Sequence, residues 1–538
     1  MALTKVTNEL LEIGVLADTT NFTDSILISQ NASTGTLDAA TNNTGLGDTV
    51  FAALTSGDNN TSIGADSCKA LTTGTNNVAV GFAALEANTT ASNNVAIGFT
   101  ALLSNTTGVE NIAIGKGALD ANTTADSNVG IGNNALGSNT TGATNVAVGA
   151  AALDANTTAS HNTALGNQSL GANTTGAENT AVGSLALDAN TTGTRNTAVG
   201  YLSLTANTTA DNNTAMGYAS LFSNTTGATN TAYGSGTLLS NTTASNNVAV
   251  GNNALLSNTT GTSNTAVGSG ALDANTTASE NTAFGFDALG VCTTGGANTA
   301  IGYAAMSTGD VTGTLNTAVG NQALTVITTG SSNVAVGREA GDAITTGSSN
   351  TAIGTQAITA LTTGSSNTAI GKAAGENITT GSQNVILGGY TGNHQGLDVR
   401  TESDGKAIVS DGAGDIAFHN AVGTAILAGN VDVTGDSSTA NSFALADGAV
   451  TGLFGGGNGF SGVFILNDFT STGEIAIFIT GGASLVLVAQ TGANFSLTSS
   501  PTSGKYGLFI DGTTVKLKSN RGASADFRLI SFRTRTSQ

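Results

Sequence analysis

The chain has 538 residues, of which 73 are Gly, one is Pro and none is Trp, and only 9% are charged. Apolar residues make up 39% of it, too many for an ordinary disordered tract, and the Gly-rich, charge-poor composition is unusual for a globular enzyme. The net charge of -20 disfavours nucleic acid and anionic membranes as partners, because both carry negative charge themselves. The composition therefore predicts a thin and regular protein.

Residues 1–42 are irregular and hold the one plausible helix, at about residues 8–16. Glu9 and Glu12 interrupt the first apolar stretch, which is not the layout of a secretory signal. No apolar run reaches the length of a transmembrane helix, so we expect no membrane insertion.

Residues 43–388 repeat a 17-residue motif with the consensus N-[TV]-A-[VI]-G-x-x-A-L-x-x-N-T-T-[GA]-x-x. Its strand-closing Gly recurs every 17 residues from Gly47 to Gly302, once after 18 residues at Gly320, and again every 17 residues to Gly388. A short fixed period with constant small and apolar positions is typical of a solenoid in which each repeat is one coil. The sequence thus predicts a β-solenoid over residues 43–388.

The composition of the repeat favours strands over helices. Val, Ile and Thr dominate, and Asn and Gly recur about every eight residues, without the three- and four-residue apolar spacing of a helix. We expect two short strands and two turns in each coil. Two apolar columns are predicted to face inward: the residue before the strand-closing Gly, such as Ile63 and Val80, and the Leu five places later, such as Leu85.

Two Asn columns accompany these apolar columns. The Asn that opens each coil, from Asn60 to Asn384, predicts a left-handed turn residue and an amide ladder along the stack. The Asn of the NTT motif persists from Asn88 to Asn275 and is replaced later by Cys292 or by Ile, so we expect it to be at least partly buried. With coils about 4.8 Å apart, Cys68 lies too far from Cys292 for a disulfide.

The chain beyond residue 388 loses the period. Residues 389–440 alternate short apolar runs with Gly and Asp, and we interpret them as a neck. Residues 441–538 contain six or more alternating strands, and Asp511-Gly512 between two of them is a hairpin signal. This region predicts an antiparallel β-sandwich or jelly-roll knob.

The pentads NVAVG, NVAIG, NTAVG and NTAIG resemble the head repeats of trimeric autotransporter adhesins, although the 17-residue period here is longer. The resemblance covers about residues 43–388. It implies a left-handed parallel β-roll and a homotrimer.

The two ends resemble a different family. MALTKVTNELLE resembles the start of marine bacteriophage tail fibre proteins, and residues 386–418 resemble the segment that follows such repeats in those fibres. This resemblance implies a virion protein whose N-terminus docks on a tail or adaptor protein and whose C-terminal tip binds a host-surface glycan or protein. The alternatives are a bacterial trimeric adhesin, extracellular or on the cell surface, and a polysaccharide-cleaving tailspike.

The basic residues of the tip are the candidate receptor contacts. Seven of the fifteen Lys and Arg residues follow residue 504, and host polysaccharides are commonly anionic. The candidates are Lys516, Lys518, Arg521 and Arg528. The alternative interpretation is that they are ordinary solvated strand residues or contacts at a trimer axis.

Enzymatic chemistry has little support in the sequence. The three His residues and two Cys residues lack metal-ligand spacing, and the acids of the repeats are isolated, whereas a glycosidase needs two carboxylates about 5 to 10 Å apart. We therefore predict no catalytic, metal or cofactor site. The regular Thr columns also raise an ice-binding alternative, although the strand preference of Thr explains them equally well.

Overall fold

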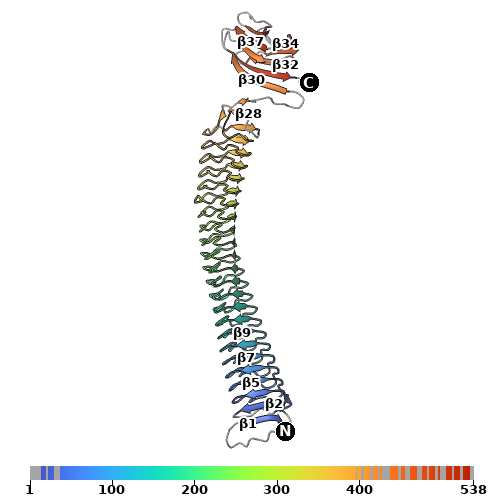
Figure 1. The fold of residues 1–538 in the computed structure, drawn as a ribbon, viewed down its shortest axis with the longest axis vertical. Coiled ribbons are helices and arrows are strands. Elements are labelled where there is room, and N and C mark those ends of the chain that lie inside the picture. The colour runs from blue at the N-terminus through green and yellow to red at the C-terminus, as the bar shows by residue number, and fades with distance from the viewer. Residues whose placement is uncertain are drawn as a thin grey trace. The chain divides into compact units, whose positions relative to one another are not determined.

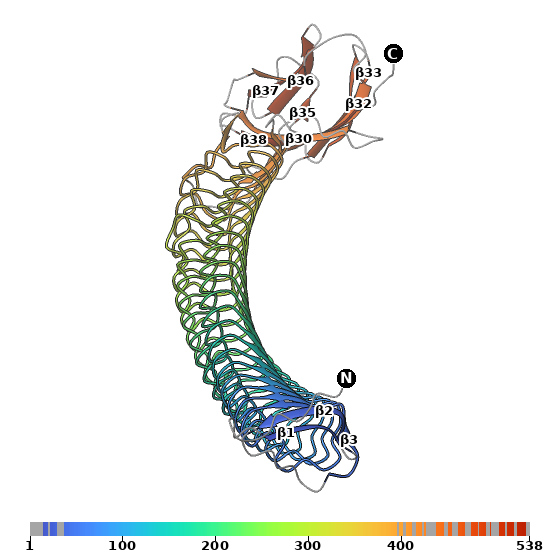
Figure 2. The ribbon, with the colours of Figure 1, turned by 60° about the horizontal axis from the view of Figure 1, so that its bottom comes forward.

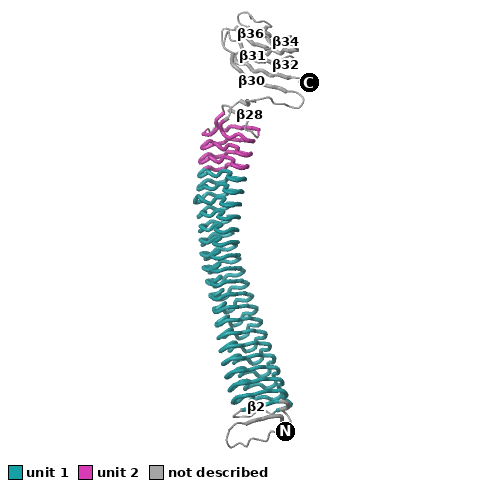
Figure 3. Tube along the Cα trace, in the orientation of Figure 1, with its two compact units in different colours: residues 1–346 teal, residues 347–538 magenta. Residues whose placement is uncertain are grey.

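A computed structural model describes residues 14–19, 22–29, 37–394, 397–401, 405–411, 416–421 and 424–426, and nine strands between residues 437 and 533. Side chains are described within residues 25–411. The chain divides into two compact units, residues 1–346 and residues 347–538 (Figure 3). The described residues form strands and turns, without a helix.

Each repeat forms one coil with a single three-residue strand, and strands of successive coils pair in parallel (Figure 1). The parallel β-solenoid predicted from the period is thus confirmed. In the first unit the strands are β4 (Thr44–Leu46), β5 (Thr61–Ile63), β6 (Val78–Val80), β7 (Val95–Ile97), β8 (Ile112–Ile114), β9 (Val129–Ile131), β10 (Val146–Val148), β11 (Thr163–Leu165), β12 (Thr180–Val182), β13 (Thr197–Val199), β14 (Thr214–Met216), β15 (Thr231–Tyr233), β16 (Val248–Val250), β17 (Thr265–Val267), β18 (Thr282–Phe284), β19 (Thr299–Ile301), β20 (Thr317–Val319) and β21 (Val334–Val336). In the second unit they are β22 (Thr351–Ile353), β23 (Thr368–Ile370) and β24 (Val385–Leu387).

The strands point their middle residue at the core and both neighbours outward. Ala79, in the middle of β6, is fully buried, as is the middle Ala of nearly every coil. The prediction that the residue before the strand-closing Gly faces inward is wrong, because Ile97, Leu165 and Phe284 are 38%, 47% and 56% exposed. Side chains alternate along a strand, and the interior of the coil is so narrow that the small Ala takes the inward position.

The Leu column faces the core, as predicted, with Leu85 and Leu102 fully buried. The second strand expected in each coil is absent from the described coils, and turns occupy its place. The backbone is left-handed at Ala83 and again at Leu85, with φ near 54° at both, whereas a parallel strand needs φ near −120°. The segment that carries the Leu column therefore turns too sharply to form a strand.

The opening Asn residues form the predicted amide ladder. The backbone N–H of Asn94 donates to Oδ1 of Asn77 one coil earlier, at 3.0 Å. The side-chain amide of Asn94 donates across the core to the carbonyl of Gly108, at 3.0 Å. The left-handed backbone that we assigned to this Asn belongs instead to the residue before it, Asn93, with φ 62°.

The Asn residues of the NTT motif form a second buried ladder, which confirms that this column is buried. The side-chain amide of Asn105 donates to the same Gly108 carbonyl, at 2.9 Å, and Oδ1 of Asn105 accepts from Asn122, at 2.8 Å. Two Asn residues thus donate to one carbonyl from opposite sides of each such coil. These hydrogen bonds hold the two sides of the coil together, and the Oδ1 atoms of the two Asn residues accept hydrogen bonds from the next coil.

The strand-closing Gly has a conformation that other residues avoid. Its φ lies between 132° and 146° from Gly47 to Gly371, and a Cβ there would collide with the carbonyl of the equivalent Gly in the next coil. Every coil needs Gly at this position because neighbouring backbones meet there.

The N-terminal end of the stack is covered by a hairpin of β1 (Gly14–Thr19) and β2 (Phe22–Ser29), shown with β3 (Ala40–Thr41) in Figure 2. β2 pairs in parallel with both β3 and β4. The helix predicted at residues 8–16 is wrong for Gly14–Leu16, which belong to β1, and its remainder lies outside the described residues.

In the second unit the parallel ladder continues past Gly388. β24 pairs in parallel with β27 (Ala407–Ser410), and antiparallel β28 (Ile416–Ala421) and β29 (Thr424–Ile426) follow. In the sequence between β24 and β27 lies a small hairpin of β25 (Asn393–His394) and β26 (Leu397–Asp398). Parallel pairing therefore extends through β2 and β27, beyond both ends of the predicted range 43–388.

The last hundred residues form two antiparallel-rich sheets. One has the order β30-β38-β32-β33-β34 and the other β31-β37-β36-β35. The hairpin predicted at Asp511-Gly512 is confirmed, because β36 and β37 pair antiparallel with Asp511 opposite Thr514. The strands are β30 (Ser437–Leu445), β31 (Val450–Phe454), β32 (Ser461–Asp468), β33 (Ile475–Gly481), β34 (Ser484–Gln490), β35 (Phe495–Ser496), β36 (Lys505–Asp511), β37 (Thr514–Asn520) and β38 (Ala525–Arg533).

Candidate interaction surfaces

The outward residues of β4 to β21, the first and third of each strand, form a surface that we call the strand wall. The first residue is Thr, Val or Ile in every strand, and the third is always apolar. Among the third residues, Leu46, Tyr233 and Phe284 expose 49%, 44% and 56% of their surface. The strand wall is therefore a continuous uncharged strip along the first unit, and its third-position column is apolar throughout.

Aromatic residues that follow the strand-closing Gly widen this strip in three places. The ring centroids are 5.4 Å apart in the stacked pair Phe82–Phe99 and 5.5 Å apart in the stacked pair Phe286–Tyr303. Tyr201 and Tyr218 form a tilted pair at 6.0 Å. Each pair joins two successive coils, because the rise per coil matches the contact distance of aromatic rings.

A recurrent group of acidic residues lies on the turns, outside the strands. Asp120, Asp154 and Asp188 stand on alternate coils, and partial burial raises the pKa of each carboxyl group. The intervening coils have Gly137 and Gly171, where an added Cβ would lie 2.7 Å from Oδ1 of Asp154 and of Asp188 respectively. The Gly residues thus leave Asp154 and Asp188 the space that a side chain on the preceding coil would fill, whereas Asp120 follows Leu103.

The described part of the chain has no group of three His, Cys, Asp or Glu residues placed to hold an ion. His161 lies on an exposed turn, with its Nδ1 2.8 Å from Oγ1 of Thr144. The side chains of the other two His residues lie outside the described residues.

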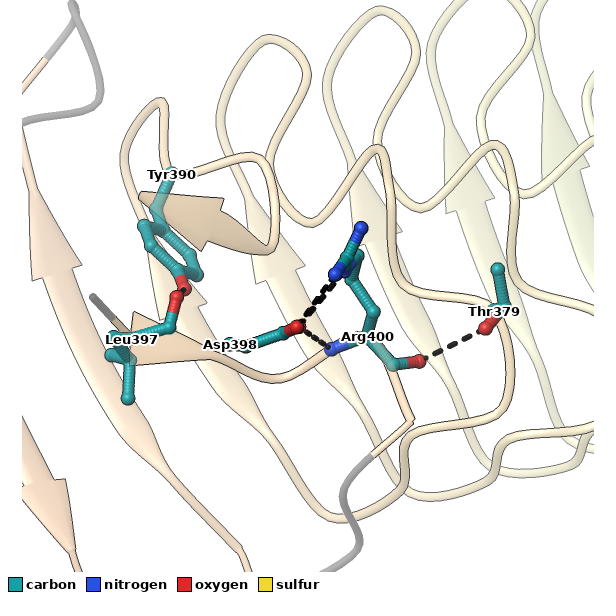
Figure 4. A network of polar contacts seen from close by, with 5 residues as sticks. All are labelled: Thr379, Tyr390, Leu397, Asp398 and Arg400. Carbon is teal, nitrogen blue, oxygen red and sulfur yellow. Dashed lines mark hydrogen bonds and ion pairs between the residues drawn. The ribbon is translucent and has the colours of Figure 1, made fainter. Parts of the chain in front are cut away.

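A polar network completes the last coil of the second unit (Figure 4). The hydroxyl of the buried Tyr390 donates to the carbonyl of Leu397 at 2.6 Å, and Arg400 pairs with the Asp398 carboxylate at 2.7 Å. These hydrogen bonds from Arg400 lower the pKa of Asp398 to about 2. The carbonyl of Arg400 accepts from Oγ1 of Thr379 at 3.2 Å, as the carbonyl of Thr379 accepts from Oγ1 of Thr362 at 3.1 Å. Residues 389–401 therefore act as a partial further coil.

Neither the strand wall nor the residues that complete the Asn ladder was predicted from the sequence. At the N-terminal end the hydroxyl of Ser25 accepts from the N–H of Asn43 at 2.7 Å. At the C-terminal end Oδ1 of Asn384 accepts from the N–H of Lys406 at 3.3 Å. The nearly constant small residue between two β-branched or larger residues was the signal for the strand wall, because a strand has room for one inward residue out of these three.

The predicted receptor contacts fall on two different sheets. Lys516 and Lys518 lie two residues apart on β37, between β31 and β36, and Lys516 is opposite Gly452 and Phe509. Arg528 lies on β38 of the other sheet, opposite Ser442 and Asn467. The side chains of all three, and Arg521 as a whole, lie outside the described residues.

The described part of the chain contains no helix with the length and hydropathy of a membrane span. No protein-family model, no curated protein and no solved structure matches the chain.

Proposed function

We propose that this protein is the subunit of a phage tail fibre, a homotrimeric structural and adhesive virion protein. In this proposal a left-handed solenoid shaft separates a receptor-binding tip from the tail. The single observation that carries it is the uniform parallel ladder of the first unit.

That ladder repeats the same contacts from coil to coil. Strand residues pair at an offset of 17, and the 18-residue step between β19 and β20 keeps Thr299 opposite Thr317. The extra residue is taken up in the turns, where the side-chain amide of Asn298 reaches the carbonyl of Gly313 across 15 residues instead of 14. A stack in which each coil contacts the next through the same bonds behaves as a stiff spacer.

The two ends supply the other functions in this proposal. The N-terminal segment, beyond the hairpin of β1 and β2, docks on a tail or adaptor protein. The two C-terminal sheets pack as a β-sandwich, and the basic residues of β37 and β38 contact an anionic glycan on the host. Opposite charge would speed and orient such contacts and would make them sensitive to salt.

The test is binding of the purified full-length chain to host cells and to their surface polysaccharide. The double variant Lys516→Glu with Lys518→Glu should bind at least tenfold more weakly at low salt, and Lys372→Glu in the solenoid is the matched charge control. Equal binding by all three proteins would remove these residues from the receptor site. Release of new reducing ends from the polysaccharide would favour the tailspike alternative instead.

A further inference from the structure

We propose that the strand wall is the surface through which copies of this chain associate side by side, parallel and in register. This inference deepens the homo-oligomer of the proposed function and rests on it for the parallel orientation. The starting observation is that an apolar column of the repeat, the third residue of each strand, faces solvent.

The size of the strand wall exceeds what a monomer normally exposes. Nine of its eighteen third-position residues, such as Ile63, Ile97 and Ile301, are exposed by 36% or more, and the other nine are partly exposed. If each of the eighteen side chains exposes on the order of 50 Å², together they present on the order of 900 Å² of apolar surface. The largest patch of a typical monomer is about 300–600 Å², and a stable interface buries about 800 Å² per partner.

The spacing of the strand wall identifies a second copy as its partner. Apolar side chains recur once per coil, about 4.8 Å apart, over eighteen coils. A surface that packs against this row along its whole length needs the same spacing over the same length. The strand wall of another copy provides it.

Charge is consistent with the same partner. The chain carries a net charge of -20, so two copies repel each other at most of their surfaces. The strand wall has no charged residue in β4 to β21, and Asp120, Asp154 and Asp188 lie on the turns. The strand wall is thus an apolar part of the described surface that like-charged copies can bury without burying charge.

Orientation and register follow from the two ends and the long coil. A fibre that attaches at one end and binds at the other requires parallel copies. The repeat is broken once, at the 18-residue step between Gly302 and Gly320, so a shifted pairing would set this long coil against regular ones. The in-register pairing alone matches every coil with its own equivalent.

The test begins with single cysteines on the strand wall. Val80→Cys and Val319→Cys, which lie far apart on the stack, should each form disulfide-linked pairs with their own copies under mild oxidation. Thr90→Cys, on an exposed turn, is the control and should not. The native Cys68 and Cys292 are buried, and burial raises the pKa of each thiol to about 12, so neither competes at neutral pH. Cross-linking of Val80→Cys only to Val319→Cys would overturn the parallel register.

A second pair of variants tests the surface itself by light scattering. Val182→Asp with Val199→Asp places two charges on the strand wall, where both side chains face outward, and should reduce the assembly to the 52.5 kDa single chain. Circular dichroism should be unchanged, and Thr192→Asp on a turn should leave the assembly intact. If the double variant keeps the parent mass, or the parent is itself a single chain, the strand wall is not the interface. Glycan binding would still test the tip separately.

Discussion

Single residues set the geometry of each coil, and the strand-closing Gly is the least replaceable of them. Gly268 has φ 142°, and a Cβ there would meet the carbonyl of Gly285. Gly270 in the same coil has φ 69°, and the nearest atom to an added Cβ is Oδ1 of Asp287, at 3.5 Å. Asn253 occupies the equivalent position one coil earlier with φ 57°.

We expect Gly268→Ala to lower the free energy of unfolding by about 2 kcal/mol or more, because Ala is strained at this φ and displaces the next coil. Gly270→Asn should change it by less than about 0.5 kcal/mol, since Asn tolerates the left-handed region. Guanidinium chloride unfolding of both variants measures the difference. Equal destabilisation would show that close approach of the backbones is not what requires Gly at position 268.

The sequence alone was enough to assign some of the residue columns to the core, but not all of them. The buried Leu and Asn columns were predictable, because a column that is Leu in every coil from Leu85 to Leu289, or one that accepts either Asn or Ile, is expected inside. The residue before the strand-closing Gly was assigned to the core because it is always apolar, as in Ile97 and Phe284. That argument fails for a protein whose outer surface is itself apolar, and the size range from Val to Phe indicated a site without tight packing.

At the scale of the element, the NTT ladder has a defined end. Asn190 donates to Oδ1 of Asn173 at 2.8 Å, and its own Oδ1 accepts from Asn207 at 2.9 Å. Asn275 is the last member of this ladder, because Cys292 follows it. Its Oδ1 is buried without a hydrogen-bond partner among the described residues.

Asn190→Ala should therefore cost more than Asn275→Ala. Both variants leave an Oδ1 atom without its donor, that of Asn173 or that of Asn258, but only Asn190→Ala also removes an acceptor, the one used by Asn207. We expect a difference of roughly 1–3 kcal/mol in the free energy of unfolding, the cost of an unpaired buried polar group. Local hydrogen exchange in the two coils measures it, and equal costs would argue against pairing along the ladder.

The alternate Asp residues predict a dependence of stability on pH. Burial raises the folded-state pKa of Asp120, Asp154 and Asp188 above the ordinary value of 3.8. A carboxyl with a raised folded pKa stabilises the fold below the unfolded pKa, and this stabilisation is lost as pH rises through the folded pKa. Changing all three to Asn should thus raise the unfolding temperature at pH 7 and have little effect near pH 3.

Glu280→Gln, on an exposed turn, controls for the loss of a charge as such. It should leave the pH dependence of the unfolding temperature unchanged. A triple Asn variant that gains stability equally at pH 3 and pH 7 would show that burial of the carboxylates is not the cause.

The elements themselves were predictable in part. The 17-residue period and the β-branched residues were enough for the parallel strands, and Asp511-Gly512 was enough for the hairpin of β36 and β37. The second strand of each coil was not, because Leu85 and its equivalents are left-handed, a conformation that no preference of Leu indicates. The four basic tip residues were chosen from charge alone, and their division between two sheets depends on long-range strand pairing.

At the scale of the whole molecule, identical coils should be removable in whole numbers. Deletion of residues 128–161 removes two coils and places Asp120 beside Gly171, which keeps the alternation. Deletion of residues 128–144 removes one coil and places Asp120 beside Asp154, about 4.8 Å away along the stack. We expect the first deletion to keep the parent denaturant midpoint at pH 7 and the second to lower it.

The same comparison at pH 3 separates charge from packing. Protonation should restore the midpoint of the one-coil deletion if like charges are the cause. A low midpoint at both pH values would indicate that the two kinds of coil differ in shape, and the 34-residue pair would then be the true structural unit.

The direction of the Asn ladder bears on how such a chain is made. Each coil opens with an Asn whose Oδ1 atom accepts the N–H of the Asn that opens the next coil, as Asn94 accepts from Asn111 at 2.9 Å. The N-terminus of a chain leaves the ribosome first, so each newly synthesised repeat can add to a folded coil whose Oδ1 acceptor is already in place. Growth of the stack can therefore keep pace with translation, with Ser25 available as the first acceptor and Lys406 as the last donor.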